Sequence, residues 1–436
     1  MSRYAAIIGW GKYAPERVFT NHDLTKMIDT SDEWIRSRTG IEARHFADPK
    51  EATSDLATRA AWQALERADI DPSELDLIIV ATCSPDYHLP STSCIVQEHL
   101  GATKAAAFDL NAACSGFVYA LSLATQSIIT GVHNNVLVIG AETLSRWLDW
   151  NIRDTAVLFG DGAGAVVLQA SQFPSGVQSF VLGADGTGAE SLILRNGGSR
   201  IPPVGVMPNG TGLFMNGKDV YRFATRVMGR AAKEALDKAH LTADDISLFI
   251  PHQANLRIIE SAAKQLNIPM DRVFVNIQKY GNTSAASVPI ALCEAADEGR
   301  IQAGDNICLV GFGAGLTWAA ATVKWAPNLP TPGKGLPQQV VRWSRHSLAR
   351  ARSLINRTER RLDAVEFNFG QQAQNVRDQA QNVRDRVSRS VPQKPGDGAP
   401  SGSAQPSSHG ASANANGHGA PESNGAKASA GHGEKE

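Results

Sequence analysis

The sequence predicts an α/β fold made of two duplicated halves, for two reasons. Between about residues 3 and 325, β-branched apolar runs alternate with helix-like stretches, as in layered α/β proteins. An internal repeat with an offset of 171 residues also relates the first part of this region to the second. The expected strands are 75–81, 106–110, 135–140, 165–169, 246–251, 306–311 and 318–325, and the expected helices include 54–67, 114–130 and 222–238.

Three landmarks share the offset. The stretch QALERADIDPSELDLIIVA, which ends at Ala81, resembles EALDKAHLTADDISLFIPH, which ends at His252. Asn111 opens a small-residue helix start that recurs at Asn282, and NVLVIG at 135–140 recurs as NICLVG at 306–311. Helix-turn-strand units resemble one another in any α/β protein, but a constant register over about 80 residues indicates a duplication. Residues 1–172 and 173–326 are therefore expected to pack as a pseudo-twofold pair with a site built from both.

The rest of the chain differs in composition. After a Pro- and Gly-rich linker that begins at 327, Val341, Leu348, Ile355 and Leu362 recur every seven residues in an Arg-rich stretch, followed by two copies of QAQNVRD at 372–378 and 379–385. Residues 327–392 are therefore predicted to be a linker and a basic amphipathic helical extension. The Ser/Gly/Ala/Asn/His-rich residues 393–436 are expected to be disordered. This extension favours contact with a membrane surface or another protein, and a granule-associated structural protein is the alternative class.

Composition narrows the classes of function. The hydrophobic fraction of 42% and the charged fraction of 19% are typical of soluble globular proteins, and a net charge of -1 gives no general attraction to nucleic acid. Five widely spaced cysteines without a CxxC pair predict neither a disulfide framework nor a metal site. The first residues reach charge and Gly/Pro too early for a secretory signal, and no apolar run of about 18 residues occurs. We expect a cytoplasmic protein.

Cys114 is the first candidate catalytic residue. It follows the point where an apolar run ends in Asn111 and small residues, just before a helical pattern begins. The positive end of a helix favours the thiolate and lowers the thiol pKa from about 8.5, and its free amides can bind an oxyanion. The alternative interpretation of a lone cysteine is a small buried apolar residue.

His252 and Asn282 are the other two candidates. Pro251 ends an apolar strand directly before His252, so the imidazole is expected at the carboxyl edge of the sheet, where α/β proteins bind ligands. Asn282 alone is typical of a helix N-cap or a turn. In the repeat, however, Cys114 and Asn282 occupy corresponding strand-to-helix junctions, and Ala285 stands where the second half would have repeated the cysteine. One half thus supplies a nucleophile, and the other supplies proton-transfer and hydrogen-bonding groups.

Two Gly-rich turns, GDGAG at 160–164 and GFGAG at 311–315, differ from phosphate-binding loops. Neither ends in Gly-Lys-Ser/Thr, and strand-like residues follow each of them. We expect the glycines to permit close backbone approach. The amide of Ala314, in the second turn, is a candidate to face an acyl oxygen.

Several motifs together resemble β-ketoacyl-acyl carrier protein synthase III, a thiolase-fold condensing enzyme of fatty-acid synthesis. They are TSDEWIRSRTGI, NAACSGF, FGDGAGA, PHQANLRI, YGNTSAASVP and GFGAGLTW, in this order between about residues 3 and 325. The resemblance implies a five-layer α/β/α/β/α fold and a homodimer. It also implies decarboxylative Claisen condensation of an acyl-CoA with malonyl-acyl carrier protein to a 3-oxoacyl-acyl carrier protein, without a metal or organic cofactor.

The same resemblance implies roles for single residues. Cys114 accepts the acyl group, the amides of Cys114 and Ala314 hold the oxyanion, and His252 and Asn282 donate to the malonyl thioester carbonyl. The further positions are Trp34, Arg38, Arg153 and Lys218 for CoA, Arg222 and Arg257 for carrier-protein docking, and Leu89 for the acyl pocket. Lys218, where Asn is common, and Asp154, where a small residue is common, depart from the family pattern and put the CoA contacts in doubt. Leu89 stands where a partner's Phe sometimes selects short primers, so a smaller side chain favours branched or longer acyl groups.

Related enzymes are the alternatives. A starter-unit synthase of secondary metabolism, or an acyltransferase that uses the same cysteine, fits the same motifs. A hydroxymethylglutaryl-CoA synthase needs a glutamate acid/base in this site and a biosynthetic thiolase needs a second cysteine, and the motifs indicate neither.

Overall fold

The computed structural model describes residues 2–200, 212–326, 347–348, 351–362, 371–372 and 374–382. The chain divides into two units, Met1–Ala364 and Val365–Glu436. In the second unit the described residues, 371–372 and 374–382, are helical. In the first unit, 347–348 and 351–362 are helical as well. Val341 and the tail predicted to be disordered lie outside the described residues.

The first unit begins with the elements of the first half. They are β1 (Tyr4–Tyr13), β2 (Val18–Thr20), α1 (Asn21–Leu24), α2 (Asp32–Thr39), β3 (Ala43–His45), α3 (Thr53–Ala68), β4 (Leu77–Ala81), α4 (Thr92–Leu100), β5 (Ala106–Leu110), the 3₁₀ turn η2 (Ala113–Ser115), α5 (Gly116–Ile129), β6 (Asn135–Glu142), α6 (Arg153–Ala156) and β7 (Gly162–Ser171).

The second half follows with a similar order of elements. They are β8 (Gly176–Ala184), β9 (Leu192–Leu194), β10 (Leu213–Met215), α7 (Gly217–Lys238), β11 (Leu248–Pro251), α8 (Leu256–Leu266), α9 (Ile277–Tyr280), η6 (Ser284–Ala286), α10 (Ser287–Asp297), β12 (Asn306–Gly313) and β13 (Thr317–Lys324). All seven strands expected from the sequence are present. The sequence did not predict β1 and β8 of the main sheet, nor the short strands β2, β3, β9 and β10.

The main sheet shows the duplication directly. Its nine strands lie in the order β11-β12-β13-β8-β1-β7-β6-β4-β5. Reading outward from the centre, β8-β13-β12-β11 repeats the order of β1-β7-β6-β4. The two halves of the sheet meet at a single residue pair, Ala5 with Gly176. Strands β6 and β12, and the turns η2 and η6, each begin 171 residues apart, so the predicted repeat is a structural one.

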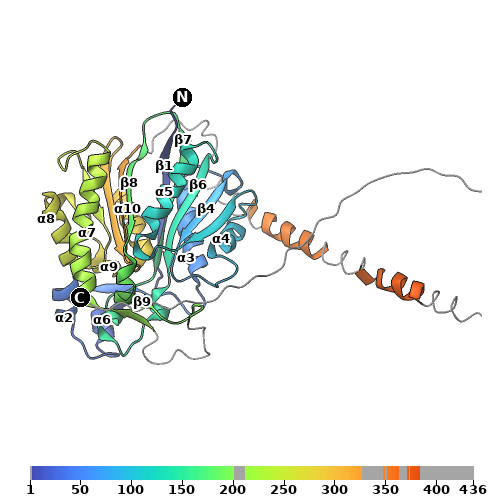
Figure 1. Ribbon diagram of the computed structural model, residues 1–436, viewed down its shortest axis with the longest axis horizontal. Coiled ribbons are helices and arrows are strands. Elements are labelled where there is room, and N and C mark those ends of the chain that lie inside the picture. The colour runs from blue at the N-terminus through green and yellow to red at the C-terminus, as the bar shows by residue number, and fades with distance from the viewer. Residues whose placement is uncertain are drawn as a thin grey trace, which may run out of the picture. The chain divides into compact units, whose positions relative to one another are not determined.

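Three clusters of buried side chains hold five layers together, and the second of them spans both faces of the middle layer. The first cluster packs α3 and α4 on the outer face of the first half-sheet. The second lies between the two half-sheets and includes Phe117 and Leu121 of α5 and Val288 and Leu292 of α10. The third packs α7 and α8 on the outer face of the second half-sheet. Figure 1 shows α7 and α8 at one side, α5 and α10 in the middle and α3 and α4 at the other side.

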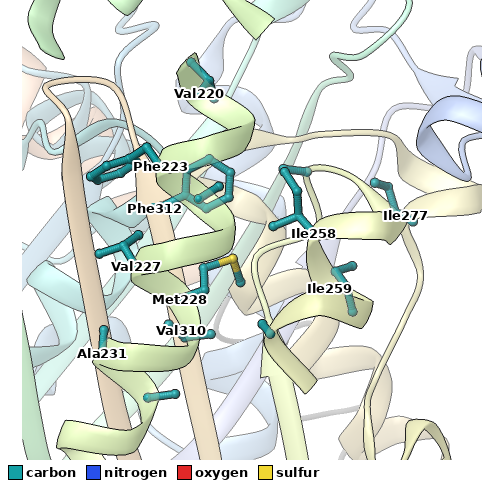
Figure 2. Packing of buried hydrophobic residues seen from close by; sticks show 14 of the residues in the cluster. Val220, Phe223, Val227, Met228, Ala231, Ile258, Ile259, Ile277, Val310 and Phe312 are labelled. Atoms are coloured by element: carbon teal, nitrogen blue, oxygen red, sulfur yellow. The ribbon is translucent and has the colours of Figure 1, made fainter. Parts of the chain in front are cut away.

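Helices α7 and α8 are amphipathic, and this explains why they cover the sheet. Figure 2 shows the apolar side chains that α7, α8, α9 and β12 turn toward one another: Val220, Phe223, Val227, Met228, Ala231, Ile258, Ile259, Ile277, Val310 and Phe312. On α7 the buried positions recur at three- and four-residue spacing, which places them on one face of the helix. The five-layer architecture expected from the resemblance is confirmed.

Candidate active site

One cavity brings the three predicted catalytic residues together. It has a volume of about 360 Å³, and its walls include Cys114 from the first half and His252, Asn282 and Phe312 from the second. Cys114 lies on η2, which immediately precedes α5, and Asn282 lies two residues before the start of η6. Both halves therefore contribute to one site, as the repeat predicts.

Close backbone packing holds Cys114 in this position. A Cβ atom added to Gly313 would lie 2.6 Å from the amide nitrogen of Cys114, and one added to Gly311 would lie 3.4 Å from its carbonyl oxygen. Only glycine at 313 allows the turn after β12 to approach the nucleophile this closely. The same turn carries Ala314, so the predicted oxyanion amide is in the segment that meets the nucleophile. Close approach is the role that the sequence indicated for these glycines.

The pKa expected for Cys114 is wrong in direction. Burial raises the pKa of the thiol to about 12, a hydrogen bond from Ser284 lowers it, and the nearby Glu142 raises it. The helix N-terminus predicted a lowered value, but the thiol is only 7% exposed, and the loss of water outweighs the favourable helix end. At neutral pH the nucleophile is thus a neutral thiol.

His252 is held as a neutral hydrogen-bond donor. The backbone N–H of Gln253 donates to the hydroxyl of Ser287 (3.3 Å), and the only other hydrogen-bond partner of that hydroxyl among the described residues is Nδ1 of His252. We therefore assign the Ser287 hydroxyl proton to the bond with Nδ1 and the ring proton to Nε2. In the described part of the chain Nε2 has no partner. Burial also lowers the pKa of His252 to about 3, so the ring is uncharged at neutral pH.

Acid is expected to destabilise the protein partly through His252. The folded-state pKa is about 3 and the ordinary value is 6.5, so the unfolded chain binds more protons between these pH values. The stability that comes from the neutral ring is complete above about pH 6.5 and falls as the pH drops toward 3, by about 2 kcal/mol at pH 5. Urea unfolding at pH 7 and pH 5 measures this. The wild type should lose about that much more stability than His252→Gln, and equal losses would contradict the expectation.

Asn282 presents its amide nitrogen to the cavity. Its Oδ1 accepts the backbone N–H of Ser284 (2.8 Å), and no partner of Nδ2 is found among the described residues. Asn111, its counterpart in the first half, accepts the N–H of Ala113 in the same way (3.1 Å). Ala113 and Ser284 also share a positive φ, of 47° and 50°. The duplicated turn thus orients the cysteine in one half and the amide donor in the other.

Three of the four residues expected at the CoA site line the cavity, and the fourth contacts one of them. Trp34, Arg38 and Lys218 line it, and the Arg153 guanidinium stacks on the Trp34 ring at 4.3 Å. Asp154 also lines the cavity.

The remaining predicted positions divide into two groups. Arg257 lines the cavity, whereas Arg222 points into solvent, 3.7 Å from Asp219. Leu89 is 88% exposed and does not line the cavity within one chain. The structure therefore brings the catalytic and CoA candidates together, but not Arg222 or Leu89.

Several residues beside the nucleophile were not identified from the sequence. Glu142 is fully buried and accepts hydrogen bonds from Ser84, from Ser284 (3.0 Å) and from the amide and thiol of Cys83. Burial raises the pKa of the Glu142 carboxyl. Its only sequence signal is a charged residue at the end of an apolar strand. Among the described residues no cluster of three His, Cys, Asp or Glu could hold a metal ion.

Comparisons with known proteins agree with this site. A family model described as 3-oxoacyl-[acyl-carrier-protein] synthase III matches residues 108–186, and the model of its C-terminal part matches 236–325. The β-ketoacyl-[acyl-carrier-protein] synthase III of Caldanaerobacter subterraneus subsp. tengcongensis is 55% identical over 324 residues, which are 74% of this chain and 98% of the relative.

Solved structures match over the same part of the chain. The β-ketoacyl-[acyl carrier protein] synthase III of Thermus thermophilus is 50% identical with a TM-score of 0.70, covering 74% of this chain and 99% of that one. A priming β-ketosynthase from a polyketide biosynthetic pathway is 39% identical with a TM-score of 0.71, covering 74% and 97%.

Proposed function

The chain belongs to the β-ketoacyl-acyl carrier protein synthase III family, and from this we propose that Cys114, His252 and Asn282 carry out its reaction. Enzymes of this family initiate fatty-acid synthesis by condensing an acyl-CoA with malonyl-acyl carrier protein. One observation supports the proposal most strongly: a single cavity holds a buried thiol, a neutral imidazole and a carboxamide, and neither Nε2 of the imidazole nor Nδ2 of the carboxamide has a partner among the residues that the structure describes.

The first half-reaction forms an acyl-cysteine. The Cys114 sulfur attacks the thioester carbon of the acyl-CoA, and the carbonyl oxygen becomes an oxyanion that the amides of Cys114 and Ala314 stabilise. When the tetrahedral intermediate collapses, CoA leaves and takes up the proton that the thiol has lost. A thiol with a pKa raised to about 12 reacts efficiently only when the bound substrate supplies an acceptor for that proton.

The second half-reaction forms the carbon–carbon bond. The Nε2–H of His252 and the Nδ2–H of Asn282 donate to the thioester carbonyl of the malonyl group, so negative charge develops there as CO₂ leaves. The resulting enolate carbon attacks the acyl-cysteine, and Cys114 departs and is reprotonated. Neutral donors suit this step, because burial disfavours the charged imidazolium, which would lose its hydration.

The CoA nucleotide is proposed to bind at the cavity mouth. The stacked pair of Trp34 and Arg153 offers a flat cationic surface to the adenine, and Arg38 and Lys218 offer positive charge to the phosphates. Asp154 lies 3.9 Å from the Arg153 guanidinium and competes with a phosphate for it. This is the departure from the family pattern that alters the CoA contacts most directly.

Reversing the charge of Arg222 is expected to weaken binding of the carrier protein alone. Its side chain is 77% exposed on helix α7, whose first residues line the cavity, and it can meet an acidic partner there. In Arg222→Glu we expect KM for malonyl-acyl carrier protein to rise about tenfold, with KM for acyl-CoA unchanged within about twofold. Lys104→Glu is the matched control, since Lys104 is an exposed cation in the turn before β5. Equal changes in the two variants would contradict a docking role.

We propose that two chains form a homodimer in the cytoplasm. Leu89 contributes to an acyl pocket only if it reaches the site of a partner, since it is 88% exposed in its own chain. Phe108 on the edge strand β5 is also exposed, which leaves that edge available for pairing. Among the described residues no helix is long and apolar enough to cross a membrane.

A starter-unit synthase of secondary metabolism is the second candidate. The observation in its favour is the 39% identity to the polyketide priming β-ketosynthase over 74% of this chain. Primer preference with malonyl-acyl carrier protein distinguishes the two. Activity confined to unusual starter acyl groups supports the second candidate, and activity with ordinary short or branched primers supports fatty-acid initiation.

The extension is proposed to mediate association with a membrane surface or another protein. Among its described residues, Leu348, Ile355 and Leu362 are exposed, at the seven-residue spacing seen in the sequence. Deleting residues 327–436 is expected to abolish partitioning to the particulate fraction of a lysate, because the exposed stripe is removed, while condensation activity persists. Fractionation of both forms tests this, and identical partitioning would refute it.

A further inference from the structure

We propose that Arg44 is a positioning residue that holds Asn282 for decarboxylation. Arg44, on β3, is completely buried. In the part of the chain that the structure describes, its guanidinium forms no ion pair: it donates to Asn21 Oδ1 (2.8 Å), to the carbonyl of Val157 (2.8 Å) and more weakly to that of Phe19 (3.4 Å). A buried cation without a carboxylate is costly. The contacts of Arg44 with the segment that pairs with Asn282 indicate its role.

The link from Arg44 to Asn282 runs through the segment 157–160. Arg44 Nη2 binds the carbonyl of Val157 at the start of this segment. The next residues pair with Asn282 on both sides of its peptide: Asn282 N–H donates to Leu158 O (2.8 Å), and Gly160 N–H donates to Asn282 O (3.0 Å). The backbone of Asn282 thus depends on a segment that Arg44 fixes.

The Cβ of Arg44 also packs against two glycines, one in the segment 157–160 and one directly before Asn282. A Cβ added to Gly160 would lie 3.0 Å from the Arg44 Cβ, and one added to Gly281 would lie 3.2 Å from it. Gly281 precedes Asn282 and has φ 64° and ψ -158°, a conformation that is essentially restricted to glycine. Arg44 therefore packs against the turn that orients the Asn282 side chain.

Two other contacts should keep the segment folded when Arg44 is changed. Asp161 N–H donates to His45 O (2.8 Å), and Ala47 N–H donates to Asp161 Oδ2 (2.8 Å). Loss of the Arg44 contacts should consequently shift the backbone of Asn282 slightly without releasing the segment. Cys114 is positioned by other contacts, with Gly311 and Gly313. The inference rests on the proposed role of Asn282 and predicts that only the step which uses Asn282 will suffer.

The test measures the two half-reactions separately in Arg44→Met and Arg44→Lys, with CoA release reporting acylation and CO₂ release from malonyl-acyl carrier protein reporting decarboxylation. We expect Arg44→Met to slow CO₂ release about tenfold and to leave CoA release within about twofold, because small misplacement of a donor is costly. Arg44→Lys should recover part of the loss. Since both rates come from the same folded fraction, partial unfolding would lower them equally and cannot imitate this result.

A double-mutant cycle separates positioning from general damage. In an Asn282→Ala background, Arg44→Met should change CO₂ release by less than about twofold, since the donor it positions is gone. Arg3→Met is the matched control: Arg3 also binds distant backbone carbonyls, of Ile128 and His133, and should lower stability without separating the two rates. Equal loss of both half-reactions, or an undiminished effect in the Asn282→Ala background, would overturn the inference. If Asn282→Ala alone releases CO₂ at the normal rate, the proposed role of Asn282 fails and the inference fails with it. If Asn282→Ala slows CO₂ release but Arg44→Met does not, only the inference fails.

Discussion

Cys114→Ala is expected to lose condensation to background, a loss of at least about 10⁴-fold, because Cys114 is the only thiol among the described residues that line the cavity. The donors for decarboxylation are untouched: His252 is held by Ser287, and Asn282 by Ser284. The variant should therefore still release CO₂ from malonyl-acyl carrier protein. Parallel assays of 3-oxoacyl product and of CO₂ measure the two activities.

Cys83→Ala is the matched control for this variant. Cys83 is the other thiol beside the site, and it is hydrogen-bonded to Glu142. We expect it to retain condensation within about tenfold, since it makes a contact but forms no bond to substrate. If Cys83→Ala abolished acylation and Cys114→Ala did not, the identity of the nucleophile would be wrong.

Asn282→Ala is expected to trap the enzyme after the first half-reaction. Removal of one donor to a developing oxyanion typically costs about 10²-fold to 10³-fold in rate. Because acyl transfer to Cys114 does not use this amide, the acyl-enzyme should form at the normal rate and then persist when malonyl-acyl carrier protein is added. Rapid-quench mass spectrometry of the acyl-enzyme follows both phases.

Asn276→Ala controls for loss of a buried asparagine in the same region. Asn276 donates to Glu294 (2.8 Å) and does not line the cavity. It should lower thermal stability yet discharge the acyl-enzyme normally. Slow acylation in Asn282→Ala, or slow discharge in Asn276→Ala, would argue against a specific role for Asn282 in the second step.

The internal repeat is the feature of the sequence that carried the prediction of the site. The constant offset of 171 residues places Cys114 and Asn282 at matching strand-to-helix junctions, and the structure has matching turns there. The seven expected strands are also present. Periodicity was sufficient for these elements because each is a continuous apolar run.

The central strand β1 was missed because its pattern is interrupted by glycine. A Cβ on Gly9 would lie 2.7 Å from the Ala68 Cβ of α3, and one on Gly11 would lie 2.6 Å from the Gln63 Cβ. Helix α3 packs so closely against the strand that these positions require glycine, which weakens any strand signal. Such a constraint comes from a neighbour about 50 residues away in sequence and has no local signature.

The sequence predicted which residues form the site better than it predicted their protonation states and hydrogen bonds. The direction of the Cys114 pKa depends on how completely the thiol is excluded from water, which no local pattern reports. Arg44, Glu142 and Ser287 act through partners at least 23 residues away, so their sequence context is that of ordinary polar residues. The roles of Trp34, Arg153, Arg222 and Leu89 came from resemblance and are still predictions.

Intact-mass spectrometry of the wild-type protein tests the central claim most directly. The protein is incubated with a panel of acyl-CoAs, digested to locate any adduct, and then treated with malonyl-acyl carrier protein. We predict a single acyl adduct on Cys114 that disappears as 3-oxoacyl-acyl carrier protein is formed, and the acyl-CoA that reacts fastest identifies the primer. The absence of an adduct with every acyl-CoA, or an adduct that malonyl-acyl carrier protein does not discharge, would contradict the proposed mechanism.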